Sequence, residues 1–174
     1  GILCGMNNEL YSILKRYFGF DSFLDHQEAV VKDVLNGEDV CVIMPTGAGK
    51  SLCYQLPLLM RPGYSIVVSP LISLMKDQVE SLTQSGVPAA FVNSTLTAAQ
   101  YGQVLWGIRN GVYKLIYVAP ERLTAPDFLD VCQALEISNL IVDEAHCVSQ
   151  WGQNFRPSYL KIAEFAKGLS RRPT

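Results

Sequence analysis

The sequence predicts an α/β domain in which a parallel β-sheet is flanked by helices. Short runs of apolar and β-branched residues alternate with segments long enough to form helices. The runs are apolar at successive positions, which is typical of strands covered on both faces. Strands joined through helices favour right-handed crossovers and parallel pairing. The expected strands are residues 40–44, 65–69, 89–92, 115–118 and 140–142.

Turn-forming dipeptides support these boundaries. Asn36-Gly37 precedes the first expected strand, Pro62-Gly63 the second and Asn110-Gly111 the fourth. The 174 residues match one ordinary domain that can bury enough apolar surface to fold alone. Residues 1–5 precede Met6 and are interpreted as a remnant of cloning, so the expected domain covers residues 6–174.

Composition limits the classes of function. The 14 Lys and Arg against 16 Asp and Glu give a formal charge of −2, so a nucleic-acid site would have to be local. No run approaches the ~18 apolar residues of a membrane span, and the amino terminus lacks a secretory pattern. The five cysteines are scattered without a C-x-x-C pair, which predicts reduced, packing thiols. We therefore expect a cytoplasmic protein with no membrane partner.

A glycine-rich loop follows the first expected strand, and a helix-compatible segment follows the loop. Residues 45–51 read P-T-G-A-G-K-S. Gly47 and Gly49 allow successive backbone N–H groups to face one anion, and the next helix adds its positive end. Lys50 is expected to bind the β- and γ-phosphates of a nucleoside triphosphate, and Ser51 to coordinate Mg²⁺. The expected nucleotide-binding residues of the loop are Thr46, Gly47, Ala48, Gly49, Lys50 and Ser51.

The loop departs from the general phosphate-loop pattern at one position. That pattern, G-x-x-x-x-G-K-[ST], has its first glycine where this chain has Met44. The alternative interpretation is a glycine-rich turn that happens to contain a lysine. The strand expected before the loop and the helix expected after it favour the phosphate site.

The last expected strand is followed by two carboxylates, Asp143 and Glu144. The carboxyl ends of parallel strands are where α/β sheets bind ligands. Asp143 is expected to hold Mg²⁺ and Glu144 to deprotonate the attacking water, so the candidate catalytic residues of this hydrolase are Glu144, Lys50 and Asp143. The alternative is that the acidic pair only caps the next helix. His146 is assigned to coupling, the alternative being a hydrogen-bonded core histidine.

The acidic pair begins a longer pattern. Residues 143–146 read D-E-A-H, and residues 147–157 continue as C-V-S-Q-W-G-Q-N-F-R-P, which resembles the aromatic-rich loop of RecQ DNA helicases. The resemblance covers nearly the whole chain from Phe18 onward and is greatest to bacterial members. Further matching strings are P-T-G-A-G-K-S-L-C-Y-Q-L-P at 45–57, S-P-L-I-S-L-M-K-D-Q-V at 69–79, N-S-T at 93–95 and A-P-E-R-L at 119–123.

The resemblance implies a RecA-like first motor lobe that hydrolyses ATP with Mg²⁺. It implies that the lobe binds one strand of single-stranded or partly duplex DNA. The motors of this family unwind DNA in the 3′ to 5′ direction. Side chains near the DNA backbone would contact phosphates without reading sequence, although each is also acceptable as a cap or turn residue. This expected DNA-facing set is Ser69, Ser73, Asn93, Ser94, Thr95 and Arg122.

The resemblance also implies a loop that couples DNA to ATP. Its aromatic side chains would stack on any base, whatever the DNA sequence. The alternative is that they pack in the core. Gln153 and Asn154 stand where the family usually has a His-Asp pair. The expected coupling residues are His146, Gln150, Trp151, Phe155 and Arg156.

An adenine-binding pattern is expected ahead of the phosphate loop. RecQ members commonly show F-G-x-x-x-F-R-x-x-Q, and residues 18–27 here read F-G-F-D-S-F-L-D-H-Q, so Leu24 replaces the arginine. Gln27 is expected to hydrogen-bond the adenine edge and Phe20 to stack on the base. The alternative for Gln27 is an exposed helix residue.

The resemblance implies further parts that would follow Thr174, the last residue given. A second RecA-like lobe would supply an arginine finger, which is worth about 10³ to 10⁵ in rate in related NTPases, so this chain alone is expected to turn ATP over slowly. The zinc-binding and winged-helix regions of the family are likewise expected to be missing from these 174 residues, which agrees with the lack of clustered cysteines. Two alternatives to a DNA motor stay open: an RNA-directed DEAH-type motor, and a nucleotide-responsive binding module without useful catalysis.

Overall fold

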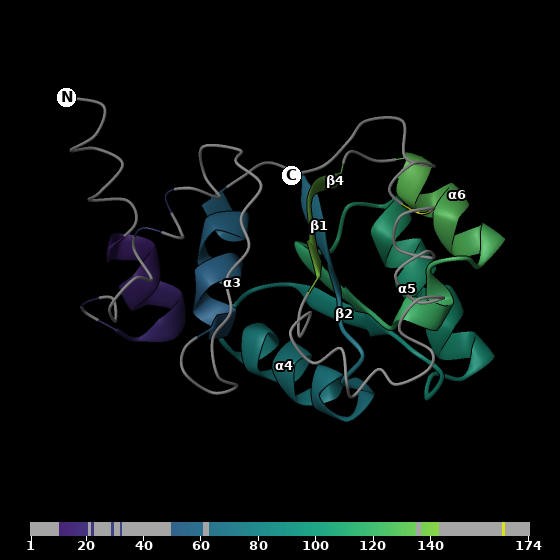
Figure 1. Cartoon of the computed structure of the whole chain (residues 1–174), viewed down its shortest axis with the longest axis horizontal. Coiled ribbons are helices and arrows are strands. Elements are labelled where there is room, and N and C mark those ends of the chain that lie inside the picture. Colours follow the sequence, from purple (N-terminus) through teal and green to yellow (C-terminus); the bar gives the residue numbers. More distant parts are fainter. Residues whose placement is uncertain are drawn as a thin grey trace. The chain divides into compact units, whose positions relative to one another are not determined.

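The chain divides into two compact units, Gly1–Pro62 and Gly63–Thr174 (Figure 1). We call them the amino-terminal unit and the sheet unit and describe each by itself. The computed structural model describes residues 11–20, 22, 29, 32, 50–60, 63–134, 137–142 and 165. Within these ranges, no helix is long and apolar enough to cross a membrane.

Two helical segments are described in the amino-terminal unit. The π-helix η1, Leu14–Phe18, ends at Gly19, whose φ of 76° is a left-handed conformation that suits glycine. Helix α3, Lys50–Met60, begins inside the P-T-G-A-G-K-S sequence, which confirms the helix predicted to follow that loop. The strand expected at residues 40–44 lies outside the described residues.

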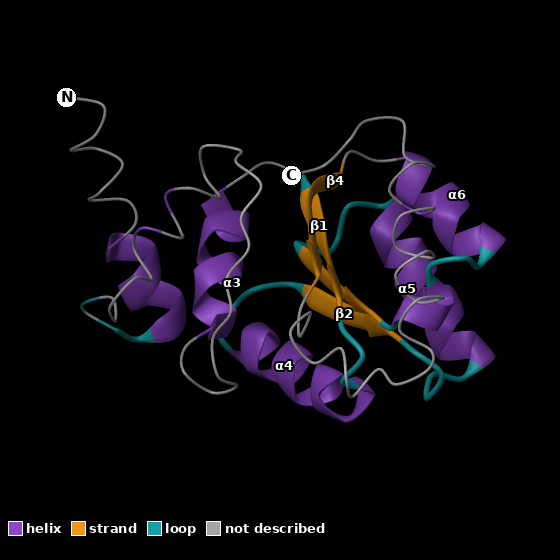
Figure 2. Cartoon of the chain, viewed as in Figure 1, coloured by secondary structure: helices purple, strands orange, loops and turns teal. Residues whose placement is uncertain are grey.

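Among the described residues of the sheet unit, four parallel strands form one sheet (Figure 2). The strand order is β2-β3-β1-β4, and each neighbouring pair is parallel. Every residue of β1 and β3 is buried, as predicted for strands covered on both faces. The predicted fold class, a parallel sheet flanked by helices, is therefore confirmed. The bounds are Tyr64–Val68 for β1, Ala89–Val92 for β2, Leu115–Val118 for β3 and Ile137–Val142 for β4.

Strand β1 lies one residue earlier than predicted, whereas β2 and β3 match the prediction. It ends at Val68, although residues 65–69 were expected to form the strand. The Ser69 hydroxyl oxygen accepts a hydrogen bond from the Leu71 N–H at 3.2 Å. Because a serine that bonds to nearby backbone favours a turn, the strand ends before it.

Strand β4 begins earlier than the predicted residue 140. Its first residue, Ile137, pairs with Tyr64, and Asn139 pairs with Ser65 after an irregularity in the register. The polar Asn139 interrupts the apolar run from which the strand was predicted. Pairing with β1 therefore decides where β4 begins, and local composition does not.

Helices cover both faces of the sheet. On one face, the Tyr117 hydroxyl of β3 donates a hydrogen bond to Oε1 of Gln78 in α4 at 3.2 Å. The neighbouring Ile116 and Val118 point to the opposite face, where they join a cluster with residues of α5 and α6 (Figure 2). The helices with described bounds in the sheet unit are α4 (Ile72–Gln84), α5 (Ala98–Arg109) and α6 (Pro126–Ala134), with a 3₁₀ turn η2 (Pro120–Arg122).

Helix α5 begins at a capping box. The Thr97 hydroxyl accepts a hydrogen bond from the Gln100 N–H at 3.2 Å, and the Gln100 side-chain oxygen accepts one from the Thr97 N–H at 2.9 Å. A cap of this kind stabilises a helix by about 1 kcal/mol. It fixes the start of α5, so the connection from β2 spans only residues 93–97.

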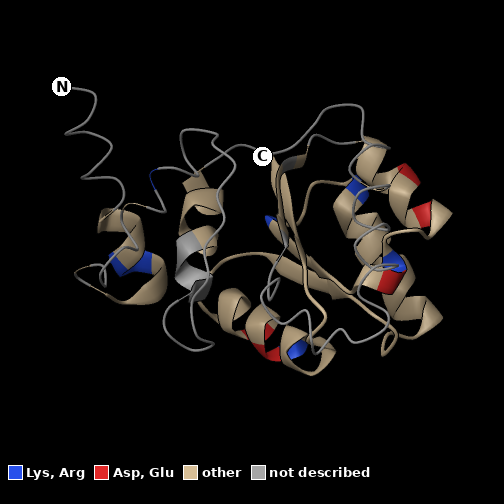
Figure 3. Ribbon diagram, in the orientation of Figure 1, with Lys and Arg blue, Asp and Glu red and all other residues tan. Residues whose placement is uncertain are grey.

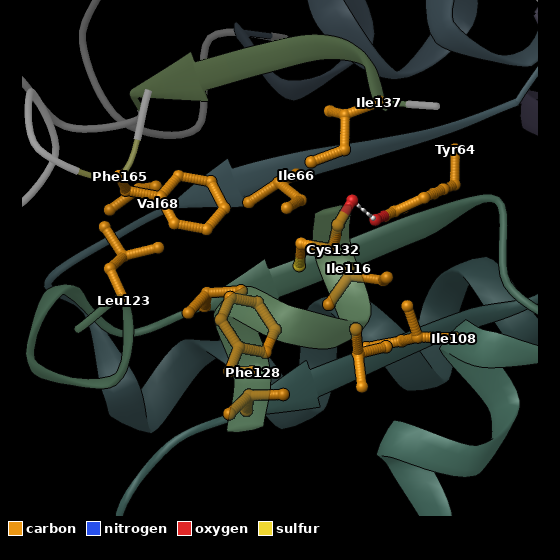
Figure 4. Close-up of a cluster of buried hydrophobic side chains, with 13 residues drawn as sticks. Tyr64, Ile66, Val68, Ile108, Ile116, Leu123, Phe128, Cys132, Ile137 and Phe165 are labelled. Carbon is orange, nitrogen blue, oxygen red and sulfur yellow. Dashed lines mark hydrogen bonds between the residues drawn. The ribbon is translucent and has the colours of Figure 1, made fainter. Parts of the chain in front are cut away.

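The main core lies between the sheet and helices α5 and α6 (Figure 4). The rings of Phe128 and Phe165 stack with centroids 5.9 Å apart. The Tyr64 hydroxyl donates to the Cys132 carbonyl at 3.4 Å, and burial raises the pKa of the Cys132 thiol to about 12. Each fully buried large apolar side chain contributes ~1.5–3 kcal/mol. The buried cluster comprises Tyr64, Ile66, Val68, Val92, Ile108, Ile116, Val118, Leu123, Phe128, Val131, Cys132, Ile137 and Phe165.

Positively and negatively charged residues are interspersed along the described helices of the sheet unit (Figure 3). On α4, Lys76 Nζ lies 4.0 Å from Glu80 Oε1 in an exposed pair. Such exposed pairs contribute little to stability. This mixed pattern fits the formal charge of −2. On these helices an anion would be attracted by individual cationic side chains and not by a broad positive surface.

Candidate functional site

The four strands end in register, and we call this end of the sheet the strand-end edge. Val68 of β1 pairs with Val118 of β3 and with Val142 of β4, and Val118 pairs with Val92 of β2. The four strands therefore end side by side. Because the carboxyl ends of parallel strands are where α/β sheets bind ligands, this edge is the candidate site.

Backbone hydrogen bonds continue past the ends of the strands. The Ser69 N–H donates to the Val118 carbonyl at 3.1 Å, and the Ala119 N–H donates to the Val92 carbonyl at 3.0 Å. Ser69 is only 4% exposed, and its hydroxyl oxygen accepts the Leu71 N–H. The first residues after β1 and β3 are therefore held in place, and Ser69 serves the turn into α4.

In the loop after β2, the hydroxyl residues Ser94 and Thr95 are exposed, as is the helix-capping Thr97. Asn93 is only 2% exposed, and its Oδ1 accepts hydrogen bonds from the Thr95 N–H at 2.9 Å and from the Thr95 hydroxyl. Its amide nitrogen faces Met75 Sδ at 3.6 Å. Ser73, in the first turn of α4, is also exposed. Of these residues, Ser73, Ser94 and Thr95 are exposed, and the buried Asn93 holds Thr95 in place.

Arg122 ends the η2 turn after β3 and is partly exposed. Its guanidinium carbon lies 5.7 Å from the centroid of the Tyr101 ring. The Tyr101 hydroxyl donates to Asp127 Oδ1 at 2.9 Å, and burial together with this hydrogen bond raises the pKa of Tyr101. Among the residues that the structure describes, no carboxylate forms an ion pair with Arg122. Its charge is therefore available to an anion.

The predicted phosphate loop enters the described residues only at its end. Lys50 and Ser51 are the first two residues of α3, where free N–H groups and the helix dipole favour an anion. Phe20 is 56% exposed, and its predicted stacking on adenine stays a prediction. The side chains of Lys50 and Ser51 lie outside the description, as do Thr46, Gly47, Ala48 and Gly49.

The remaining predicted site residues also lie outside the described residues, so their roles stay predictions. Strand β4 ends at Val142, and the D-E-A-H sequence follows it directly. The residues concerned are Gln27, Asp143, Glu144, His146, Gln150, Trp151, Phe155 and Arg156.

Tyr101 and Asp127 were not among the predicted site residues. They are 26 positions apart in the chain, and they meet because α5 packs against α6. No periodicity relates them to Arg122, so only the tertiary fold reveals the contact. Asn139 is a further buried polar residue that was not predicted, and its amide has no partner among the described residues.

Two solved structures share this fold. The crystal structure of a hypothetical ATP-dependent RNA helicase from Sulfolobus tokodaii superposes with a TM-score of 0.73 at 24% identity, covering 93% of this chain and 48% of that one. The DUF1998 helicase MrfA, crystallised with DNA and AMPPNP, gives a TM-score of 0.69 at 19% identity, covering 93% of this chain and 24% of that one. At these identities the likeness establishes the fold alone, and it agrees with the predicted RecA-like helicase lobe.

Other helicases have higher sequence identity to this chain than these two structures do. The ATP-dependent DNA helicase RecQ of Bacillus subtilis is 44% identical over 169 residues, which is 97% of this chain and 29% of that helicase. RecQ of Haemophilus influenzae is 47% identical over 151 residues, which is 87% of this chain and 24% of that helicase. The predicted resemblance to RecQ helicases is confirmed, and the chain spans less than a third of the length of these relatives. Because the DEAD/DEAH box helicase model matches residues 24–173, the chain belongs to the DEAD/DEAH box helicase family.

Proposed function

We propose that this chain is the ATP-binding motor lobe of a DNA helicase, which couples ATP hydrolysis to 3′ to 5′ translocation on single-stranded DNA and to unwinding. The observation that carries the proposal is the register of β4 with β1. It brings the chain out of the sheet at Val142, immediately before the D-E-A-H sequence and beside the end of β1. The identities of 44% and 47% with RecQ DNA helicases favour DNA over RNA as the partner.

The residues of this chain meet the chemical demands of a magnesium nucleotide. Lys50 and Ser51 begin α3, an 11-residue helix whose first N–H groups favour phosphate oxygens. The Ser51 hydroxyl and the Asp143 carboxylate are the oxygen ligands that Mg²⁺ prefers. When bound, Mg²⁺ supplies positive charge opposite the phosphate oxygens. Gln27 and Phe20 would hold the adenine.

In this proposal, Glu144 is the general base. Its carboxylate orients the attacking water and takes its proton, while the Lys50 ammonium group stabilises negative charge on the phosphates. A second lobe would add an arginine whose charge is worth about 10³ to 10⁵ in rate. We therefore propose that this chain binds the nucleotide well and hydrolyses it slowly on its own.

The strand-end edge supplies the contacts to DNA. The exposed hydroxyls of Ser73 and Ser94 donate to phosphates, and Arg122 adds a cation. The Thr95 hydroxyl already donates to Asn93 Oδ1, so it reaches a phosphate only by exchanging that bond. None of these groups needs to read a base edge, so the grip is independent of DNA sequence. This arrangement fits a motor that moves along any single strand.

ATP binding and turnover in a two-lobe protein that carries this chain test the proposal. Lys50→Ala should abolish nucleotide binding, whereas Lys76→Ala, at an exposed position on α4, should not. Glu144→Gln should keep nucleotide affinity and abolish hydrolysis, because the amide preserves shape but takes no proton. Single-stranded DNA should stimulate wild-type turnover more than single-stranded RNA of equal length.

The outcomes separate the alternatives. Stronger stimulation by RNA would identify an RNA-directed motor. Tight ATP binding without turnover in the two-lobe protein would identify a nucleotide-responsive binding module. No binding at millimolar ATP by a folded sample would remove the phosphate-loop assignment itself.

A further inference from the structure

Three side chains from three elements form a line of contacts at the strand-end edge. The Arg122 guanidinium carbon lies 5.7 Å from the centroid of the Tyr101 ring. The Tyr101 hydroxyl donates to Asp127 Oδ1 at 2.9 Å, and the same oxygen accepts the Phe128 N–H at 2.9 Å. Arg122 is thus connected, through an aromatic ring, to a carboxylate that is fixed at the start of α6.

Backbone hydrogen bonds fix the points from which these side chains project. The Arg122 N–H donates to the Ala119 carbonyl at 3.0 Å, and the Ala119 N–H donates to the Val92 carbonyl at 3.0 Å. Turn η2 is therefore tied to the end of β2. The Tyr101 N–H donates to the Thr97 carbonyl at 2.9 Å. Tyr101 is therefore held in the first turn of α5, directly after the capping-box residue Gln100. The backbone of both Arg122 and Tyr101 is therefore fixed by hydrogen bonds.

The ring contact leaves the hydrogen-bonding groups of Arg122 unused. Cation–π attraction depends on the charge above the ring face and consumes none of the five guanidinium N–H donors. In the described parts of the chain, Arg122 has no carboxylate partner, and Oδ1 of Asp127 accepts hydrogen bonds from Tyr101 and Phe128. A planar guanidinium with free donors matches two oxygens of a phosphate.

We propose that Tyr101 and Asp127 are positioning residues, which aim the Arg122 guanidinium at a backbone phosphate of single-stranded DNA. The inference rests on the proposed function and adds to it two residues outside the helicase-like strings. Tyr101 fixes the guanidinium through its ring, and Asp127 fixes the ring through its hydroxyl. An arginine held in this way loses less side-chain freedom when it binds, so its contact is stronger.

Binding of a fluorescein-labelled oligothymidylate to the 174-residue chain, measured by anisotropy between about 50 and 200 mM salt, tests the proposal. Arg122→Ala removes one phosphate contact, so the slope of log affinity against log salt should become shallower by about 0.7 and affinity should fall about tenfold. Tyr101→Leu should produce the same two changes. Tyr101→Phe keeps the ring but removes the hydrogen bond to Asp127, so both changes should be smaller than in Tyr101→Leu but still measurable.

A double variant and a matched control sharpen the test. Because Tyr101 acts through Arg122, adding Tyr101→Leu to Arg122→Ala should cause no further loss. Tyr113→Leu is the matched control, since Tyr113 is also a partly buried tyrosine packed on the core cluster, but it precedes β3 at the opposite end from Arg122. It should leave the salt slope unchanged. Melting temperatures identify any variant that loses its fold.

Each result decides one part of the inference. A normal slope for Tyr101→Leu beside a reduced slope for Arg122→Ala would overturn the positioning role and leave DNA binding intact. A normal slope for Arg122→Ala would overturn the phosphate contact. If Tyr101→Leu unfolds, Asp127→Ala at its exposed site replaces it, and a normal slope and affinity there would count against positioning. No binding by the wild-type chain at about 50 mM salt would instead defeat the DNA-binding part of the proposed function, and this inference with it.

Discussion

The side-chain oxygen of Asn93 accepts hydrogen bonds from both the backbone N–H and the hydroxyl of Thr95. The Asn93 amide nitrogen faces the Met75 sulfur of α4 at 3.6 Å. One buried amide therefore ties the loop after β2 to a helix on one face of the sheet. This arrangement keeps Thr95 at the surface while Asn93 itself stays out of solvent.

Asn93→Ala should lower the free energy of unfolding by about 1–3 kcal/mol, because it removes an acceptor from the Thr95 N–H and hydroxyl and leaves a small cavity. Urea unfolding measures the change. Ser94→Ala, at the exposed neighbouring position, should stay within about 0.5 kcal/mol of the wild type. Equal stability of the two variants would show that the amide does not hold the loop.

Local chemistry was sufficient to predict most of the sheet. The apolar runs of β2 and β3 predicted those strands to the residue, since both are short and bounded by turn residues. The start of β4 at Ile137 was missed because Asn139 breaks the apolar run, and pairing with β1 overrides that break. The order β2-β3-β1-β4 could not be predicted, because it depends on which strands meet after the helices have packed.

In the candidate site, too, local sequence predicted some features and tertiary packing determined the others. A helix after the glycines was predicted, because a phosphate loop precedes a helix, although α3 begins at Lys50, before the loop sequence ends. The burial of Asn93 and the contact of Arg122 with Tyr101 could not be predicted, because both depend on tertiary packing. Motif strings indicate which residue types act, whereas packing decides which of them reach solvent.

Two glycines of α5 should respond oppositely to alanine. A Cβ at Gly102 would meet no atom within 4 Å, so Gly102→Ala should raise the free energy of unfolding by about 0.5–1 kcal/mol through helix propensity. A Cβ at Gly107 would lie 2.8 Å from the Tyr113 Cζ. Gly107→Ala should therefore lower stability, by about 1 kcal/mol, because the ring must move. Thermal and urea unfolding provide both values.

A second variant tests whether the Tyr113 ring causes the loss of stability in Gly107→Ala. In a Tyr113→Ala background the obstructing ring is absent, so Gly107→Ala should become stabilising by about the amount seen at Gly102. A loss of stability that persists without the ring would mean that the surrounding helix, and not Tyr113, rejects the methyl group.

Stability should fall above pH ~9 through Cys132. Burial raises the pKa of this thiol from its ordinary 9.0 to about 12, so between these values the folded protein keeps a proton that the unfolded chain has released. The stabilisation is complete below pH ~9 and is lost as the pH rises through that window, by about 1 kcal/mol at pH 10. Urea unfolding at pH 7.5 and 10 measures it, with Cys132→Ala as the variant that should lose this part of the dependence. An unchanged pH dependence in that variant would assign it to other groups.

Trp151 lies outside the described residues, and its predicted role in coupling depends on its place seven positions after Glu144. An aromatic face that stacks on a base contributes about 1–3 kcal/mol without reading sequence. In a two-lobe protein, Trp151→Ala should then reduce DNA-stimulated hydrolysis and unwinding while ATP affinity and melting temperature stay nearly normal. If the ring is instead part of the core, the same change should cost about 3–5 kcal/mol of stability and weaken every activity together. Normal DNA stimulation in a folded fraction with a much lower melting temperature would therefore assign Trp151 to the core and remove it from the coupling loop.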